Sequence, residues 1–200
     1  MDRREFLKLC GAGLAGTVLL GTVGSRGVLA KESSCLVEEF EEAAEKYHVP
    51  KELLLAIGYV NTPWEMPPPE ASEYEEGELD GKGTYGIMAL VRNPSADTLG
   101  EASRLTGIST EKLKTHRKSN ILGGAALLAK SQGERPTTLG DYLGAVDGEG
   151  GNGEVFEAVS GIGGGELYAD QISDTLKKGA SARTKSGEEV LCRPRASRPG

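Results

Sequence analysis

Acidic side chains crowd the middle of this chain, in a loop that follows a strongly apolar segment. A run of three prolines lies among them. These carboxylates are Glu65, Glu70, Glu73, Glu75, Glu76, Glu78 and Asp80. A carboxylic acid held in a poorly solvated pocket can transfer a proton in general acid–base catalysis. Carboxylates grouped in a proline-bounded loop are typically solvated and of ordinary acidity, so this loop alone indicates no reaction.

Other kinds of catalytic site find little support in the sequence. The Gly-x-Gly-x-x-Gly string at residues 148–153 follows no predicted strand, so it lacks the setting in which such a loop holds phosphate. The two histidines, His48 and His116, occur without a Gly-x-Ser-x-Gly elbow, which argues against a Ser/His/Asp hydrolase. No Cys-x-x-Cys pair or histidine-rich segment could ligate zinc. We therefore expect no cofactor and no metal ion.

An ordered set of short motifs is more informative than any single residue. Its members are Tyr47-x-Val49-Pro50-x-x-Leu53-Leu54-Leu55-Ala56-Ile57, Gly83-x-Tyr85-Gly86-Ile87-Met88, Leu99-Gly100-Glu101-Ala102, Leu105-Thr106-Gly107 and Asn120-Ile121-x-x-Gly124-Ala125-x-x-Leu128. In order and spacing this set resembles the lysozyme-like domain of soluble lytic transglycosylases. The closest version is the one in front of the amidase domain of some exported bacterial N-acetylmuramoyl-L-alanine amidases. The resemblance covers roughly residues 36–180.

The resemblance implies a chemistry, and the sequence departs from it at the decisive place. Members of the family cut the bond between N-acetylmuramic acid and N-acetylglucosamine, with a glutamic acid at the end of the buried second helix as proton donor. That position is Asn61 here, Thr62 replaces the serine that follows, and Ala89 replaces a wall glutamine. An amide carries no acidic proton. Because a general acid contributes about 10²–10⁴-fold to a rate, these departures predict that glycosidase activity is lost.

The resemblance therefore favours a protein that binds peptidoglycan glycan strands without cleaving them. The residues expected to line its cleft are Asn61, Trp64, Glu65, Tyr85 and Met88. A weakly active muramidase or lytic transglycosylase is the alternative, with Glu65 as a substitute acid just past the helix end. A third interpretation is an envelope interaction or scaffold protein, a truncated relative of cell-wall amidases, whose partner is an amidase or another envelope protein.

The first thirty residues carry the features of an export signal. Arg3 and Arg4 precede Phe-Leu-Lys, an uncharged glycine-rich stretch follows at residues 9–25, and Val28-Leu29-Ala30 offers a small-residue cleavage site. This order predicts a twin-arginine signal peptide at residues 1–30 and a mature protein in the cell wall, the periplasm or the medium. The uncharged stretch is too short and glycine-rich for a good anchor, so we expect no stable membrane span after its removal.

Charge is distributed unevenly along the chain. The whole chain carries a net charge of −7, and residues 31–176 alone carry −14, which argues against nucleic acid as a partner. Residues 177–200 carry +5. We expect a basic C-terminal tail at residues 181–200, as a solvated end or as a contact for an anionic polymer or lipid surface.

Two cysteines remain after removal of the signal. Cys35 and Cys192 stand near the two ends of the mature chain. Outside the membrane such thiols can form a disulfide or stay free, and the sequence leaves both outcomes open.

Helices must position the expected cleft. Six segments have helical apolar spacing: residues 36–47, 51–60, 97–106, 109–118, 120–131 and 166–178. Two shorter candidates are residues 139–146 and 154–159. Asp97 and Gly107 are a predicted cap and stop, and Pro63 should end the buried second helix. No strand pattern of any length is visible, so we predict a mainly α fold. The family resemblance implies that this fold is a lysozyme-like helical domain with long loops at residues 31–180.

Overall fold

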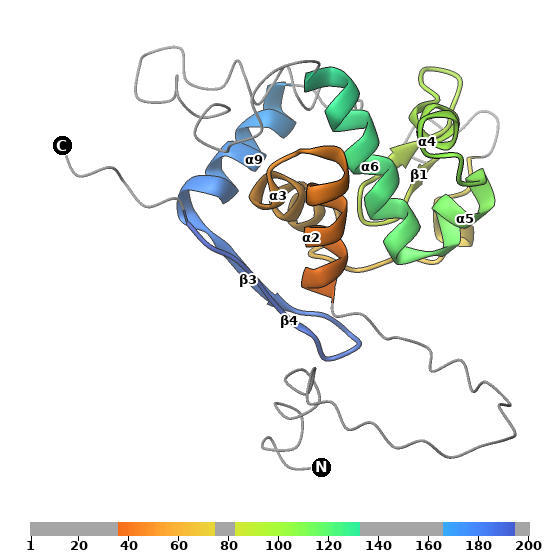
Figure 1. Ribbon diagram of the computed structural model, residues 1–200. Helices are drawn as coiled ribbons and strands as arrows, with labels where there is room; N and C mark the ends of the chain where they lie inside the picture. Colours follow the sequence, from red (N-terminus) through yellow and green to blue (C-terminus); the bar gives the residue numbers. More distant parts are fainter. Residues whose placement is uncertain (1–35, 75–82, 133–165, 195–200) are drawn as a thin grey trace, which may run out of the picture. The chain divides into compact units, whose positions relative to one another are not determined.

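The computed structural model describes residues 36–74, 83–132 and 166–194 (Figure 1). The chain divides into two compact units, Met1–Cys35 and Leu36–Gly200, and the second holds every described residue. Its helices are α2 (Leu36–Tyr47), α3 (Lys51–Asn61), α4 (Thr98–Thr106), α5 (Thr110–Thr115), α6 (Arg117–Gln132) and α9 (Glu166–Lys178), with a short 3₁₀ helix η1 (Pro69–Ser72). The predicted mainly α fold class is confirmed. The two short helical candidates, at residues 139–146 and 154–159, lie outside the described residues.

Helix α3 is the centre of the described part, with α2, α6 and α9 packed against it (Figure 1). Its run from Leu53 to Gly58 is buried, because apolar residues occupy nearly every side of the helix. Gly58 permits the closest approach: a Cβ there would lie 2.9 Å from side-chain atoms of both Phe40 and Ile87. The apolar helix thus brings its C-terminal end, at Asn61, against the segment around Ile87.

The predicted boundaries hold where the end signals are local. Asp97 Oδ1 accepts a hydrogen bond from Gly100 N at 2.9 Å, and Gly107 ends α4 with a φ of 71°. The expectation for residues 109–118 is wrong, because α5 ends at Thr115 and α6 begins at Arg117. The extended backbone of His116 separates the two helices, and its carbonyl accepts the first bond of α6.

Strands occur where none were predicted. Strands β1 (Thr84–Tyr85) and β2 (Leu90–Val91) form one antiparallel pair, and β3 (Ala180–Arg183) and β4 (Glu189–Cys192) form another. The expectation of a solvated end is therefore wrong for residues 180–192. In β4 the buried Val190 and Cys192 alternate with the exposed Glu189 and Leu191, so one side of the hairpin packs on the helices. A four-residue alternation is too short to stand out in a sequence.

An ionic cluster ties this hairpin to the helices. Arg117 Nε lies 2.6 Å from Glu39 of α2, and its Nη1 lies 2.6 Å from Glu188 beside β4. Glu188 also accepts a hydrogen bond from the backbone N of Leu36 at 2.9 Å. Burial alone would raise the pKa of Glu188, but hydrogen bonds from Ser186 and Arg117 hold it below its ordinary value. The cluster therefore joins α2, α6 and the hairpin through charged, hydrogen-bonded groups.

Candidate functional site

A cleft of about 430 Å³ opens at the C-terminal end of α3. Its walls come from that helix end, the loop that follows, the β1–β2 hairpin and α9. The lining residues are Val60, Asn61, Thr62, Pro67, Ser72, Thr84, Gly86, Ala89, Tyr168 and Gln171. None of them carries a charge at neutral pH, and the polar ones offer hydroxyl and amide groups.

Asn61 is held from two sides in this cleft. Its Nδ2 donates a hydrogen bond to the carbonyl oxygen of Ile87 at 3.2 Å. Its side chain is also hydrogen-bonded to the hydroxyl of Tyr168. Burial raises the pKa of Tyr168 to about 12, although the bond to Asn61 opposes the shift. Tyr168 is thus a neutral hydroxyl at physiological pH, and Asn61 and Tyr168 form an uncharged pair.

The wall opposite Asn61 is fixed from behind by Asn120 of α6. Asn120 Oδ1 accepts a hydrogen bond from Met88 N at 2.8 Å, and its Nδ2 donates to the carbonyl oxygens of Tyr85 at 2.9 Å and Leu113 at 3.0 Å. Gly86, with a φ of 73°, passes so close that a Cβ would lie 2.3 Å from Asn120 Nδ2. This fully buried amide satisfies the backbone of the turn between β1 and β2 and holds it against α6.

Two of the five residues expected in the cleft are core residues instead. Trp64 is 1% exposed, and its Nε1 donates a hydrogen bond to the carbonyl oxygen of Leu55 at 2.8 Å. Met88 is also 1% exposed and packs over Gly124 of α6, where a Cβ would lie 2.7 Å from it. Neither side chain lines the cleft, because both fill space between helices.

The other three expected residues are separated from one another. Asn61 lines the cleft, as expected. Glu65 is not among the lining residues, and its Oε1 accepts a hydrogen bond from Lys185 N at 2.6 Å, which fastens the β3–β4 turn. Tyr85 lines a different hollow. Only Asn61 of the five is therefore brought to the cleft.

Sequence reasoning missed Tyr168 and Gln171, the contribution of α9. Both lie one turn apart on α9, a helix that was predicted correctly. The sequence feature that could have identified them is this tyrosine and glutamine on one face of an amphipathic helix. This feature alone does not predict a site, because no residue within α9 indicates that the helix packs beside α3. Asn120 belongs to one of the motifs named above, but its hydrogen bonds to the turn were not predicted.

The possible disulfide between Cys35 and Cys192 is described only at its Cys192 end. Cys192 is a buried, free thiol whose Sγ points to the carbonyl oxygen of Glu52 at 3.8 Å. Burial, with the charge of Glu52, raises the pKa of Cys192 to about 11, so the thiol is protonated at neutral pH. Cys35 lies outside the described residues.

In residues 36–74, 83–132 and 166–194, no three histidine, cysteine or acidic side chains gather as a metal site would require. No helix within these ranges has the length and apolar character needed to span a bilayer.

The chain matches none of the protein-family models, curated proteins or solved structures with which it was compared. Its function must therefore be argued from the residues of the cleft and from the sequence.

Proposed function

We propose that this protein binds the glycan strands of peptidoglycan in the cleft at Asn61 and does not cleave them. The observation that carries the proposal is the neutral polar lining of that cleft. Amide and hydroxyl groups pair with the hydroxyl and acetamido groups of a glycan, and the ring of Tyr168 offers a face to a sugar. The proposal includes a lysozyme-like arrangement of the helices, in line with the family that the motifs resemble.

We propose binding without cleavage because the described lining of the cleft has no carboxylic acid that could donate a proton. A glycosidase needs a carboxylic acid beside the leaving oxygen, with a raised pKa. The described lining residues include no carboxylate. Asn61 stands where the family has its acid, and its amide is already engaged by Ile87 and Tyr168. Such a site can bind a glycan through hydrogen bonds, but it lacks the carboxylic acid that would protonate the leaving oxygen.

The proposal also places the protein outside the cytoplasmic membrane. Residues 1–30 supply the twin-arginine address, and residues 31–200 would act in the cell wall, the periplasm or the medium. Peptidoglycan is the polymer within reach there. Export and glycan binding are thus two parts of one proposal, and each can be tested alone.

The first test measures binding of the mature protein, residues 31–200, to purified insoluble peptidoglycan by co-sedimentation at moderate salt. Tyr168→Phe removes one hydroxyl from the cleft and should weaken binding about three- to tenfold, the worth of one hydrogen bond. Tyr47→Phe, on α2 and away from the cleft, is the matched control and should bind as the parent does. Absence of affinity in the parent would overturn the proposal.

The second test asks whether the parent cuts the polymer. Turbidity of a cell-wall suspension and release of soluble fragments should stay at the background level. Glu65→Gln should leave both unchanged, because Glu65 holds Lys185 and does not line the cleft. Fragment release that disappears in Glu65→Gln would establish the enzyme alternative in place of the binding protein.

A further inference from the structure

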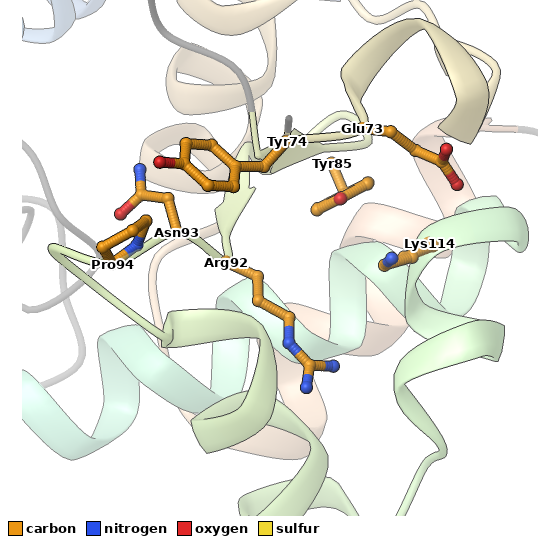
Figure 2. Close-up of a pocket in the computed structure, with 7 residues that line it drawn as sticks. All are labelled: Glu73, Tyr74, Tyr85, Arg92, Asn93, Pro94 and Lys114. Carbon is orange, nitrogen blue, oxygen red and sulfur yellow. The ribbon is translucent and has the colours of Figure 1, made fainter. Parts of the chain in front are cut away.

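A second hollow, of about 490 Å³, lies beside the β1–β2 hairpin (Figure 2). Tyr85 lines it, whereas its neighbours Thr84 and Gly86 line the cleft. Successive residues of a strand face opposite sides, so the hairpin is a wall shared by the two hollows. The preceding loop is shared in the same way, with Ser72 on the cleft and Tyr74 on the second hollow.

The second hollow differs from the cleft in carrying two cations. Arg92, directly after β2, and Lys114 of α5 border it together with the rings of Tyr74 and Tyr85 (Figure 2). Lys114 Nζ lies 4.1 Å from the centroid of the Tyr85 ring, a cation–π contact that orders the ammonium group. Within the described ranges, neither Arg92 nor Lys114 forms an ion pair with a carboxylate.

The other described lining residues offset only part of this positive charge. Asn93 and Pro94 are neutral, and Glu73 is the one acid among the described lining residues. The carboxylate of Glu73 points away from Arg92 in Figure 2, toward the edge of the hollow. The described lining residues therefore carry a net charge of +1, in a region of sequence, residues 31–176, whose net charge is −14.

We infer that this hollow binds a free carboxylate of a short peptide, and that the peptide is the stem attached to a glycan strand lying in the cleft. The inference rests on the proposed function for the origin of the peptide. An arginine fork and a lysine ammonium group recognise a carboxylate, and the ring of Tyr74 offers an apolar face to the adjoining methyl or methylene groups. The negative net charge of the chain repels a polyanion at long range, which favours a ligand with one or two carboxylates.

The test compares an N-acetylmuramoyl tripeptide that has free carboxylates with the same compound fully amidated. Affinities for residues 31–200 are measured by NMR titration at low salt. The acid form should bind about three- to tenfold more tightly, since two partly exposed charge pairs are lost on amidation. The double variant Arg92→Gln/Lys114→Gln should abolish this preference.

The matched control is Arg104→Gln/Lys112→Gln, which removes the same two charge types from exposed positions on α4 and α5 outside both hollows. It should keep the preference. An acid form that binds no better than the amide would overturn the inference, and so would a control variant that loses the preference as fully as Arg92→Gln/Lys114→Gln.

A third probe, peptide-free glycan strands, separates this inference from the proposed function. Strands that bind the parent and Arg92→Gln/Lys114→Gln equally, with no preference for the acid tripeptide, would refute the carboxylate site and leave glycan binding intact. An acid tripeptide that binds through Arg92 and Lys114, beside strands that do not bind, would support the carboxylate site and refute glycan binding in the cleft.

Discussion

The two hollows on either side of the β1–β2 hairpin are similar in volume, about 430 and 490 Å³, but differ in chemistry. The cleft at Asn61 offers amides and hydroxyls, and the hollow at Tyr85 offers two cations beside two rings. Neutral groups select a ligand by the geometry of its hydrogen bonds, whereas charges add an attraction that depends on salt. A thin wall of two short strands can therefore separate two kinds of recognition within one small domain.

The largest expected effect comes from breaking the wall itself. Asn120→Ala leaves the buried polar groups of Tyr85, Met88 and Leu113 without their partner and should cost about 3 kcal/mol of unfolding free energy. Both hollows should lose their ligands together. Thermal denaturation and the two binding assays measure this. Ser119→Ala, on the same helix, is the control and should cost less than about 1 kcal/mol. A variant that unfolds like the parent would contradict the role given to Asn120.

Placing an acid at residue 61 tests whether a proton donor in the proposed glycan-binding cleft is sufficient for glycosidase activity. In Asn61→Glu the new carboxyl group would face the carbonyl oxygen of Ile87, which favours the protonated form and raises its pKa. We expect fragments to be released from purified peptidoglycan at about 10²-fold above background. Asn61→Gln is the neutral control. Equal inactivity of both variants would mean that the cleft lacks more than the acid.

The ionic cluster at Arg117 offers a change that should spare both hollows. Glu188→Gln weakens charged hydrogen bonds to Arg117 and Leu36 and should lower the unfolding free energy by about 1–2 kcal/mol. Glycan and tripeptide affinities should not change, because no residue of the cluster lines either hollow. Chemical denaturation followed by both binding assays tests the separation. Altered affinity at either hollow would show that the cluster also shapes the site.

The same cluster predicts a pH dependence of stability. The folded pKa of Glu188 is below its unfolded value, which is about 4.3, so its stabilisation is complete above that value. It is lost as the pH falls from there through the lower folded pKa. The parent should therefore lose more stability over this acid range than Glu188→Gln does. Denaturation midpoints of the two proteins between neutral and acid pH measure the difference.

The smallest expected effect distinguishes the hollows by salt. Raising ionic strength from low to physiological values should reduce the preference for the acid tripeptide about twofold, because its charge pairs are partly exposed. Binding of peptide-free glycan strands should stay constant, since none of the described residues that line the cleft is charged. Titrations at two salt concentrations give both numbers. A glycan affinity that falls with rising salt would mean that charged groups contribute to binding in the cleft. It would contradict the proposed difference between the two hollows.

Local signals explain how much of the fold the sequence predicted. Asp97 and Gly107 bound α4 as expected, α9 spans Glu166–Lys178 as expected, and Pro63 follows the end of α3. The hairpins were missed because each strand is two to four residues long and its pairing depends on residues elsewhere. The boundary between α5 and α6 was missed as well. Arg117, the first residue of α6, forms ion pairs with Glu39 and Glu188, which lie far away in the sequence.

The candidate site was predicted only at its centre. Asn61 was expected at the end of a buried helix, and it lies in the cleft because that end is a property of the helix itself. Trp64 was expected in the cleft, but its hydrogen bond to Leu55 and its packing against Tyr59 place it in the core. Glu65 does not line the cleft, and its carboxylate accepts a hydrogen bond from the backbone N of Lys185. Lys185 lies in a segment that was expected to be a solvated end.

Apart from the boundary between α5 and α6, the sequence by itself determined where the main helices begin and end, because caps, prolines and apolar spacing act within a few residues. Only the tertiary structure decided which side chains meet. Tyr168 interacts with Asn61 although more than a hundred residues separate them in the sequence. Asn120 of α6 accepts a hydrogen bond from the backbone N of Met88, in the turn between β1 and β2. Such contacts depend on how the helices pack as bodies, and packing is a property of the whole buried surface that no short stretch of sequence contains.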